Sequence, residues 1–193
     1  MGAPVTRPVI VGITGASGAA YGLSLLELLK QLGRQTHLIM TRPGIQVLEH
    51  ETGLDAARVA GMATHHWDVD DLAAPPASGT FLTAGMVIAP CTIRTLSAVA
   101  CARSSNLLER AADVTLKERR PLVLMVRETP LHAGHLRLML EAAQAGAVIM
   151  PPVPAFYLRP RSLDDLVRHS AAKALDLLGI EHDLIQRWGH ETE

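Results

Sequence analysis

Aromatic side chains are scarce in this sequence, at 3% of 193 residues. Hydrophobic residues nevertheless make up 48% of the chain, so a core has to be packed mainly from aliphatic side chains and methionine. Each of the few aromatic residues, including Tyr157, thereby becomes a candidate for a specific task. The length is ordinary for one domain, and we expect residues 1–193 to form a single domain with one core.

Cysteine is scarcer still, with Cys91 and Cys101 as its two occurrences. They form no CxxC pair and no wider pattern of metal ligands, which excludes a disulfide framework and a zinc site of the usual spacing. Such a composition is typical of a reducing intracellular compartment. His132 and His135 are spaced like a metal-binding pair, but no third ligand accompanies them in the sequence, and we expect no metal.

The sequence also has no excess of positive or negative residues. Lys and Arg number 18 and Asp and Glu 19, so the formal net charge is −1, and no basic excess attracts nucleic acid or an anionic membrane. Residues 1–8 lack the apolar stretch of a signal peptide, and the sequence has no apolar run long enough to cross a bilayer. We therefore expect a soluble cytoplasmic protein whose partners are small molecules or other proteins.

Short apolar strands alternate with segments of helical periodicity along the chain. Strands are expected at residues 9–13, 36–40, 86–89, 122–126 and 147–150. Helices are expected at residues 21–32, 46–50, 95–102, 135–145 and 163–178. Continuously apolar strands separated by helices predict a parallel sheet covered on both faces, an α/β three-layer fold of the Rossmann-like or flavodoxin-like kind. Residues 61–83 are expected to form a long loop, which in a compact domain often has a function.

A glycine-rich turn joins the first strand to the first helix, with Gly12, Gly15 and Gly18 in a G-x-x-G-x-x-G pattern. Such a turn presents backbone N–H groups and a helix start to an anion, and Ser17 adds a hydroxyl group. The spacing differs from the dinucleotide fingerprint, and residues 40–42 lack the acid that binds an NAD ribose. The turn predicts a site for a nucleotide or flavin phosphate, with a merely structural turn as the alternative.

Polar side chains also follow two other strands. Residues 90–95 bring two hydroxyl groups and a cation to a helix start, where Thr92 is either a ligand donor or only a helix cap. Cys91 has no activating histidine nearby in the sequence and is expected to be a packed thiol. Arg127 and Glu128 follow the strand at 122–126, where Arg can hold a phosphate and Glu can move a proton. Since α/β sheets bind ligands at this edge, we expect a pocket there, with Glu128 inside it.

Seven sequence blocks taken together resemble the UbiX flavin prenyltransferase family. They are residues 15–18, 75–79, 90–92, 109–114, 116–124, 127–131 and 151–157. They occur in the order and spacing of that family from about residue 8 to residue 188, and so are more specific than any one glycine turn. Thr41 and Thr92 stand where serines are usual, which keeps the hydroxyl group. Leu72 stands where some members have a tryptophan against the prenyl group.

The resemblance implies that FMN binds at a subunit interface of a homo-oligomer, commonly a dodecamer. The residues that it assigns to FMN are Gly15, Ala16, Ser17, Thr41, Thr92, Ile93, Arg94, Thr95 and Arg127. Those that it assigns to dimethylallyl phosphate are Ser78, Arg110, Lys117, Arg127, Glu128, Tyr157 and Lys173. The implied catalytic residues are Glu51, Lys117 and Glu128.

By the same resemblance, the reaction joins the dimethylallyl group to N5 and C6 of reduced FMN, and the prenylated FMN then serves a UbiD-type decarboxylase. Ionising an allylic phosphate needs cations and hydrogen bonds on the leaving oxygens, which the implied lysines, Arg127 and Tyr157 can supply without a metal. Closing the second bond needs a proton acceptor, for which Glu128 or the released phosphate is placed by analogy.

Two other functions stay open at this point. An FMN-dependent cysteine decarboxylase of related fold would need a catalytic histidine after the first helix region, where this chain has only His50 in an unmatched context. A non-catalytic FMN carrier bound to a decarboxylase would need the glycine turn but not a cationic pocket. The presence of Lys117, Arg127 and Lys173 argues against that second alternative.

Overall fold

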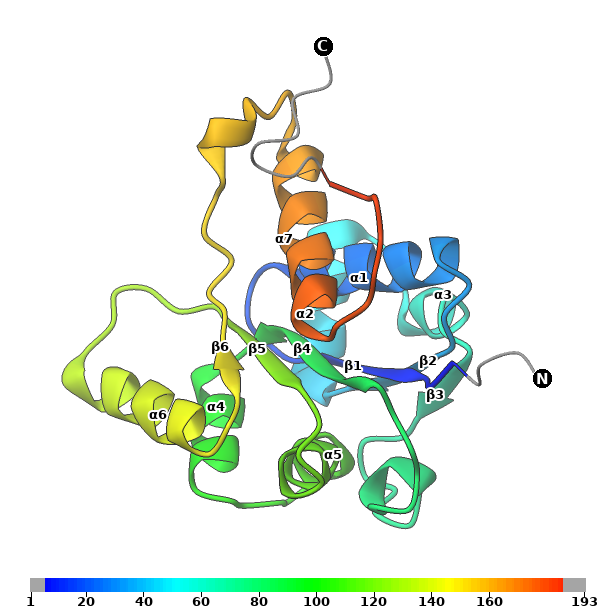
Figure 1. Ribbon diagram of the computed structural model, residues 1–193, viewed down its shortest axis with the longest axis vertical. Coiled ribbons are helices and arrows are strands. Elements are labelled where there is room, and N and C mark those ends of the chain that lie inside the picture. The colour runs from blue at the N-terminus through cyan, green and yellow to red at the C-terminus, as the bar shows by residue number, and fades with distance from the viewer. Residues whose placement is uncertain (1–5, 186–193) are drawn as a thin grey trace.

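The computed structural model describes residues 6–185. A six-stranded parallel sheet in the order β3-β2-β1-β4-β5-β6 forms the middle layer, with helices on both faces (Figure 1). The strands are β1 (Val9–Ile13), β2 (Thr36–Met40), β3 (His65–Trp67), β4 (Gly85–Cys91), β5 (Leu122–Val126) and β6 (Val148–Ile149). This strand order is that of the Rossmann arrangement, which confirms the expected three-layer α/β fold.

One face of the sheet is covered by four helices. They are α1 (Ala19–Gln31), α2 (Arg42–Thr52), α3 (Ala56–Ala60) and α7 (Leu163–Leu177). Leu25 and Leu29 of α1 have no exposed surface and share one core with Leu175 of α7 and Val11 of β1. Burying one such leucine stabilises the fold by roughly 1.5–3 kcal/mol. The leucine stripe of α1 therefore decides which side of that helix faces the sheet.

The opposite face is covered by three helices, which Figure 1 shows below the sheet. They are α4 (Ile93–Ala100), α5 (Leu107–Lys117) and α6 (Ala133–Gln144). The sequence did not predict α5 as a helix, because four charged residues are interleaved with its apolar positions. Leu107, Leu108 and Ala111 of α5 are fully buried in the second core. Of the charged residues, Glu109 is also buried and accepts hydrogen bonds from Ser105, whereas Arg110, Asp113 and Lys117 are partly or fully exposed. Amphipathic packing, not sequence propensity alone, makes this segment helical.

Residues 61–83 do not form the uninterrupted loop that the sequence suggested. They contain β3 and a short 3-10 helix, η1 (Pro75–Ala77). The first two residues of β3 are exposed, so this strand has no apolar run from which it could be predicted. The Trp67 side chain fastens it to β2 by donating a hydrogen bond of 2.8 Å from Nε1 to Nδ1 of His37. Burial and the neighbouring His65 lower the pKa of His37 to about 4, so His37 stays a neutral acceptor at pH 7.

The chain changes direction within the sheet between β1 and β4, which are neighbours although they are not consecutive. The segment after β1 leads to α1 on one face, and the segment after β4 leads to α4 on the other (Figure 1). Backbone hydrogen bonds tie the strand ends together, from Thr41 N–H to Ile13 O at 3.0 Å and from Arg127 N–H to Cys91 O at 3.1 Å. Open α/β sheets bind their ligands at such a switch point.

Residues 150–162 extend away from the sheet before α7 begins, and they carry a second 3-10 helix, η2 (Phe156–Leu158) (Figure 1). Apolar side chains are exposed along and beside this arm, with Val153 72%, Phe156 71% and Leu163 81% accessible. Grouped exposed apolar side chains usually mark a surface that another protein covers. Within residues 6–185, no helix is both long and apolar enough to cross a membrane.

Candidate active site

The turn after β1 is fixed by the Thr14 side chain. Its hydroxyl group donates to Pro90 O at 2.7 Å and accepts from Thr92 N–H at 2.9 Å, which joins the ends of β1 and β4. Gly15 packs against α2 so closely that a Cβ atom there would lie 2.6 Å from Cβ of Pro43. The glycine at this position is therefore required by the close approach of two chain segments.

The start of α1 is capped by a side chain from another helix. Glu51 of α2 accepts hydrogen bonds from Gly18 N–H and Ala19 N–H, both at 2.9 Å. Burial alone would raise the pKa of Glu51, but the Ser17 hydroxyl, these two N–H groups and the nearby Arg127 together lower it. Glu51 is thus an anion at neutral pH, and it occupies the helix start that the sequence assigned to a phosphate.

Two threonines at this edge act as helix caps. Thr41 accepts from Gly44 N–H at 3.1 Å at the start of α2, and Thr92 accepts from Thr95 N–H at 3.1 Å at the start of α4. The Thr92 hydroxyl also donates to the Thr95 hydroxyl at 3.0 Å. The capping role considered for Thr92 is therefore confirmed. A capping oxygen keeps a second lone pair, so this role leaves room for a ligand contact.

The edge retains donors that suit an anionic group such as the phosphate of FMN. Within residues 6–185, no acceptor bonds the backbone N–H groups of Gly15, Ala16 and Ser17, nor those of Ile93 and Arg94 in the first turn of α4. Free N–H groups of a turn and of a helix start bind phosphate readily. All of them lie beside the switch point between β1 and β4. The residues present therefore fit the phosphate group of FMN.

Arg127 and Glu128 follow β5 at the same edge, as expected. Both are exposed in the protomer, and Glu128 accepts a hydrogen bond from Thr129 N–H at 3.0 Å. The expectation that Glu128 lies inside a pocket is therefore wrong for the isolated protomer, because the buried strand ends at Val126. The Cys91 thiol, by contrast, is packed as expected, and burial raises its pKa to about 12.

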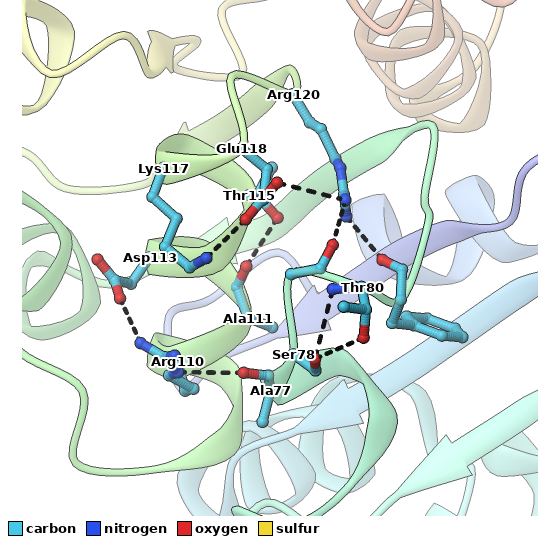
Figure 2. Close-up of polar contacts among 12 residues, drawn as sticks. Ala77, Ser78, Thr80, Arg110, Ala111, Asp113, Thr115, Lys117, Glu118 and Arg120 are labelled. Atoms are coloured by element: carbon cyan, nitrogen blue, oxygen red, sulfur yellow. Dashed lines mark hydrogen bonds and ion pairs between the residues drawn. The ribbon is translucent and has the colours of Figure 1, made fainter.

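A second group of predicted residues lies on α5 and the turn at residues 77–81 (Figure 2). Arg110 donates from Nε to Ala77 O at 3.2 Å and forms an ion pair of 2.7 Å with Asp113. Ser78 shares a hydrogen bond of 2.8 Å with Thr80, and Lys117 lies 2.6 Å from Glu118. The structure thus brings together Ser78, Arg110 and Lys117, which we call the α5 platform.

Arg120 was not predicted as part of this group. Its guanidinium group donates to Gly79 O and Phe81 O, both at 2.7 Å, and so fastens the turn to the end of α5 (Figure 2). No local sequence pattern could identify it, because its partners lie about forty residues earlier and are backbone carbonyls. The cationic run that contains it was the only signal.

Tyr157 and Lys173 form a third group with His169. The Tyr157 ring stands edge-on to that of His169 at 6.3 Å between centroids, and Lys173 lies one turn further along α7. Burial and the Lys173 charge lower the pKa of His169. Lys173 also forms an ion pair of 3.6 Å with Asp176.

These groups are separated within one protomer. Lys117 comes before the amino end of β5 and Arg127 after its carboxyl end, and five residues of a parallel strand span roughly 17 Å. Tyr157 is part of η2, on the arm that extends away from the sheet between β6 and α7 (Figure 1). One protomer therefore does not gather all predicted substrate residues around one ligand.

Metal binding by side chains is not indicated in the described residues, which contain no group of three His, Cys, Asp or Glu side chains arranged to hold an ion. The His132 and His135 rings lie 3.6 Å apart between centroids, and Nδ1 of His132 accepts from Gly134 N–H at 3.0 Å. That nitrogen caps α6.

Comparison with known proteins decides the family. The model of the family described as Flavoprotein matches residues 4–155. A flavin prenyltransferase UbiX from Thauera aromatica is 52% identical over 185 residues, which cover 96% of this chain and 95% of the relative. This chain belongs to the UbiX flavin prenyltransferase family. The cysteine decarboxylase and the non-catalytic carrier are not favoured by this relationship.

Solved structures of UbiX proteins share the fold closely. The crystal structure of AnUbiX (PadA1) in complex with FMN and dimethylallyl pyrophosphate matches with a TM-score of 0.94 and 42% identity, covering 97% of this chain and 100% of that one. A dodecameric FMN-dependent UbiX-like decarboxylase from Escherichia coli O157:H7 matches with a TM-score of 0.90 and 42% identity, covering 94% and 98% of the two chains. Both confirm the resemblance that the sequence blocks indicated.

Proposed function

We propose that this UbiX-family chain is a flavin prenyltransferase that joins the dimethylallyl group of dimethylallyl phosphate to N5 and C6 of reduced FMN. The observation that supports the proposal is that hydrogen-bond donors and cations gather in two separate places, one at the carboxyl edge of the sheet and one on the α5 platform. Both substrates of this reaction bear a phosphate. Two phosphate sites are what such a reaction requires.

FMN is assigned to the carboxyl edge. The free N–H groups of residues 15–17 and 93–94, the hydroxyl groups of Thr41, Thr92 and Thr95, and the Arg127 side chain supply donors for its phosphate and polar atoms. Reduced FMN supplies the nucleophilic ring, and the protein holds and orients it. The absence of an acid at the end of β2 agrees with FMN in preference to a dinucleotide.

The dimethylallyl phosphate is assigned to cations that different subunits contribute. Because β5 separates Lys117 from Arg127, a neighbouring subunit has to bring its α5 platform, or its Tyr157 and Lys173, to the edge that holds FMN. The exposed apolar arm with Phe156 supports such an assembly, since a partner surface would cover it. We propose a homo-oligomer, with the dodecamer of the Escherichia coli O157:H7 relative as the expected size.

The residues assigned to each step have suitable chemistry. The bond between the allylic carbon and the phosphate oxygen breaks, and Lys117, Arg127 and Lys173 stabilise the negative charge on the leaving phosphate. A bond to N5 forms first, with loss of the N5 proton. Closing the second bond then adds a proton to the CH carbon of the attached alkene, joins C6 to the neighbouring tertiary carbon and releases the proton from C6. Glu128, the released phosphate or Glu51, which is anionic at neutral pH, is the proposed acceptor. No metal is required for these steps, because the cations carry the charge.

The decisive experiment incubates the protein with reduced FMN and dimethylallyl phosphate without oxygen and measures the mass of the flavin. We expect FMN to gain one dimethylallyl group and inorganic phosphate to be released in equal amount. Unchanged FMN under these conditions, with FMN bound to the protein, would contradict the proposed activity. Dimethylallyl diphosphate in a parallel incubation tests which leaving group is preferred.

The product recipient and the location follow from the proposed reaction. Prenylated FMN is a cofactor, so we propose that it passes to a UbiD-type decarboxylase, and that this chain decarboxylates nothing itself. A location in the cytoplasm stays a prediction, which the free thiols of Cys91 and Cys101 support.

A further inference from the structure

Lys117 has a partner within its own chain. Its ammonium nitrogen lies 2.6 Å from Oε1 of Glu118, and both side chains are partly exposed, by 45% and 35%. Gly79 packs closely against this pair. A Cβ atom at Gly79 would collide with Oε1 of Glu118 and lie 2.8 Å from Nζ of Lys117. The pair therefore rests directly against the turn that carries Ser78 (Figure 2).

Arg120 offers Glu118 a second partner. The guanidinium NH2 lies 4.0 Å from Oε2 of Glu118, and its side chain is 11% exposed. Arg120 donates one hydrogen bond each to Gly79 O and Phe81 O, and a guanidinium group has five N–H donors. It thus has N–H groups left over for the carboxylate. Glu118 lies between Lys117, which is partly exposed, and Arg120, which the turn holds in place.

We propose that Glu118 is a specificity-determining residue that occupies Lys117 until a doubly charged phosphate displaces it toward Arg120. This inference rests on the proposed function, in which Lys117 binds the phosphate of dimethylallyl phosphate. A singly charged anion gains less from Lys117 than the Glu118 carboxylate already does, so it does not displace that carboxylate. A dianion gains more, and Arg120 then takes over the displaced carboxylate.

The surroundings of Glu118 make the pH dependence of this exchange simple. The charged groups that act on it are Lys117 and Arg120, and the turn at residues 77–81 brings no ionisable side chain. The hydrogen bond and charge of Lys117 hold the pKa of Glu118 below its ordinary value. Glu118 therefore stays ionised above pH 5. The substrate phosphate, in contrast, gains its second charge near a pKa of about 6.

The test compares the KM and kcat of the assembled wild-type enzyme and the Glu118→Gln variant for dimethylallyl phosphate between pH 5.5 and 8 at saturating FMN. Glutamine removes the charge that competes for Lys117, so KM at pH 8 should fall. A fall of roughly two- to five-fold corresponds to the free energy of one exposed ion pair. The kcat should stay unchanged. The rise of the wild-type KM below pH 6 should be clearly smaller in the variant, which a merely structural role would not produce.

Three further variants make the result specific. Glu118→Asp keeps the charge and should retain the wild-type pH dependence of KM. In a Lys117→Ala background, Glu118→Gln should have no further effect, because Glu118 acts through Lys117. Glu141→Gln removes a comparable carboxylate from the pair with Arg137 on α6, 3.8 Å apart, and should leave KM at the wild-type value.

The outcomes separate this inference from the proposed function. A wild-type enzyme that makes no prenylated FMN contradicts the proposed function itself. An active wild-type enzyme with a Glu118→Gln variant whose KM is equal or higher at pH 8, and whose pH profile is unchanged, overturns the role of Glu118 alone. FMN binding by the variant serves as the check on folding, since the FMN edge lies at the other end of β5.

Discussion

Replacing Lys117 should affect one of the two proposed phosphate sites and leave the other intact. Lys117 lies before β5, whereas the residues assigned to FMN lie after β1, β2, β4 and β5. Lys117→Ala should lower the rate of prenyl transfer by about 10²-fold or more, because one donor to the leaving phosphate is lost. FMN affinity, measured by flavin fluorescence, should stay at the wild-type value.

Arg137→Ala is the matched control for Lys117→Ala, because it also removes an exposed helical cation but lies on α6, away from the platform. It should transfer the prenyl group at the wild-type rate. Normal turnover in Lys117→Ala would remove this lysine from the substrate site, and weakened FMN binding would mean that the two sites are not separate.

Glu51 contributes stability through its charge at the start of α1. Its pKa in the folded protein lies below the ordinary value of 4.5, so the contribution is fully present above that value and is lost as the pH falls through the lower, folded value. Glu51→Gln should reduce the free energy of unfolding at pH 7 by about 0.5–1 kcal/mol, the usual worth of a helix cap.

Urea unfolding of wild type and Glu51→Gln at pH 7 and at pH 3 checks this dependence. The difference between the two proteins should shrink at the lower pH, because the wild-type carboxyl group becomes protonated as the pH falls through its lowered, folded-state pKa. An equal difference at both pH values would show that the carboxylate charge does not hold the start of α1.

Helix α1 lies so close to β4 that one methyl group decides the packing. A Cβ atom at Gly22 would lie 2.5 Å from Ala89 O and 2.9 Å from the Ile13 side chain. Gly22→Ala should therefore lower the free energy of unfolding by roughly 1–3 kcal/mol, the usual cost of overpacking. Gly61→Ala, where the nearest atom is at an ordinary 3.5 Å, should be nearly neutral in the same urea titration.

If Gly22→Ala proved as stable as the wild type, α1 would have to sit further from the sheet than described. Such a shift would also move the start of α1, which Glu51 caps. The FMN affinity of Gly22→Ala therefore provides a second test of whether α1 has shifted.

The elements that the sequence predicted best are the strands in which every residue is buried. The strands at residues 9–13, 36–40 and 122–126 have the predicted bounds, because every one of their residues is buried and apolar runs reveal them. Helix α2 is longer than predicted. Its start depends on the Thr41 cap and on Pro43 in the first turn, signals that the search for apolar periodicity did not use.

Within the candidate site, the sequence could predict only the residues that directly follow the ends of strands. The position of Arg127 and Thr92 at one edge follows from the parallel sheet. The capping of α1 by Glu51, 33 residues from Gly18, depends on how α2 packs, and the clamp of Arg120 on the turn at residues 77–81 depends on how that turn folds over α5. Contacts of this kind arise from tertiary packing and leave no periodic pattern in the sequence.

At the scale of the whole molecule, the FMN edge and the α5 platform of the described protomer are two proposed half-sites. The FMN edge and the α5 platform lie at opposite ends of β5, and the exposed apolar arm provides a surface for assembly. If each active site takes its FMN edge from one subunit and its platform from another, two inactive variants can complement each other. Arg127→Ala removes a cation from the edge, and Lys117→Ala removes one from the platform.

Mixed oligomers of these two variants, formed by co-expression, should regain prenyl transfer although each variant alone has almost none. With equal amounts and random assembly, about a quarter of the sites combine an intact edge with an intact platform, so activity per site should approach a quarter of the wild-type rate. Simple mixing of the purified oligomers, in which subunits do not exchange, is the control and should stay inactive. Co-expressed oligomers without activity, shown by mass spectrometry to contain both subunits, would mean that each subunit builds its site alone, and the separation across β5 would then have to close by a movement within the chain.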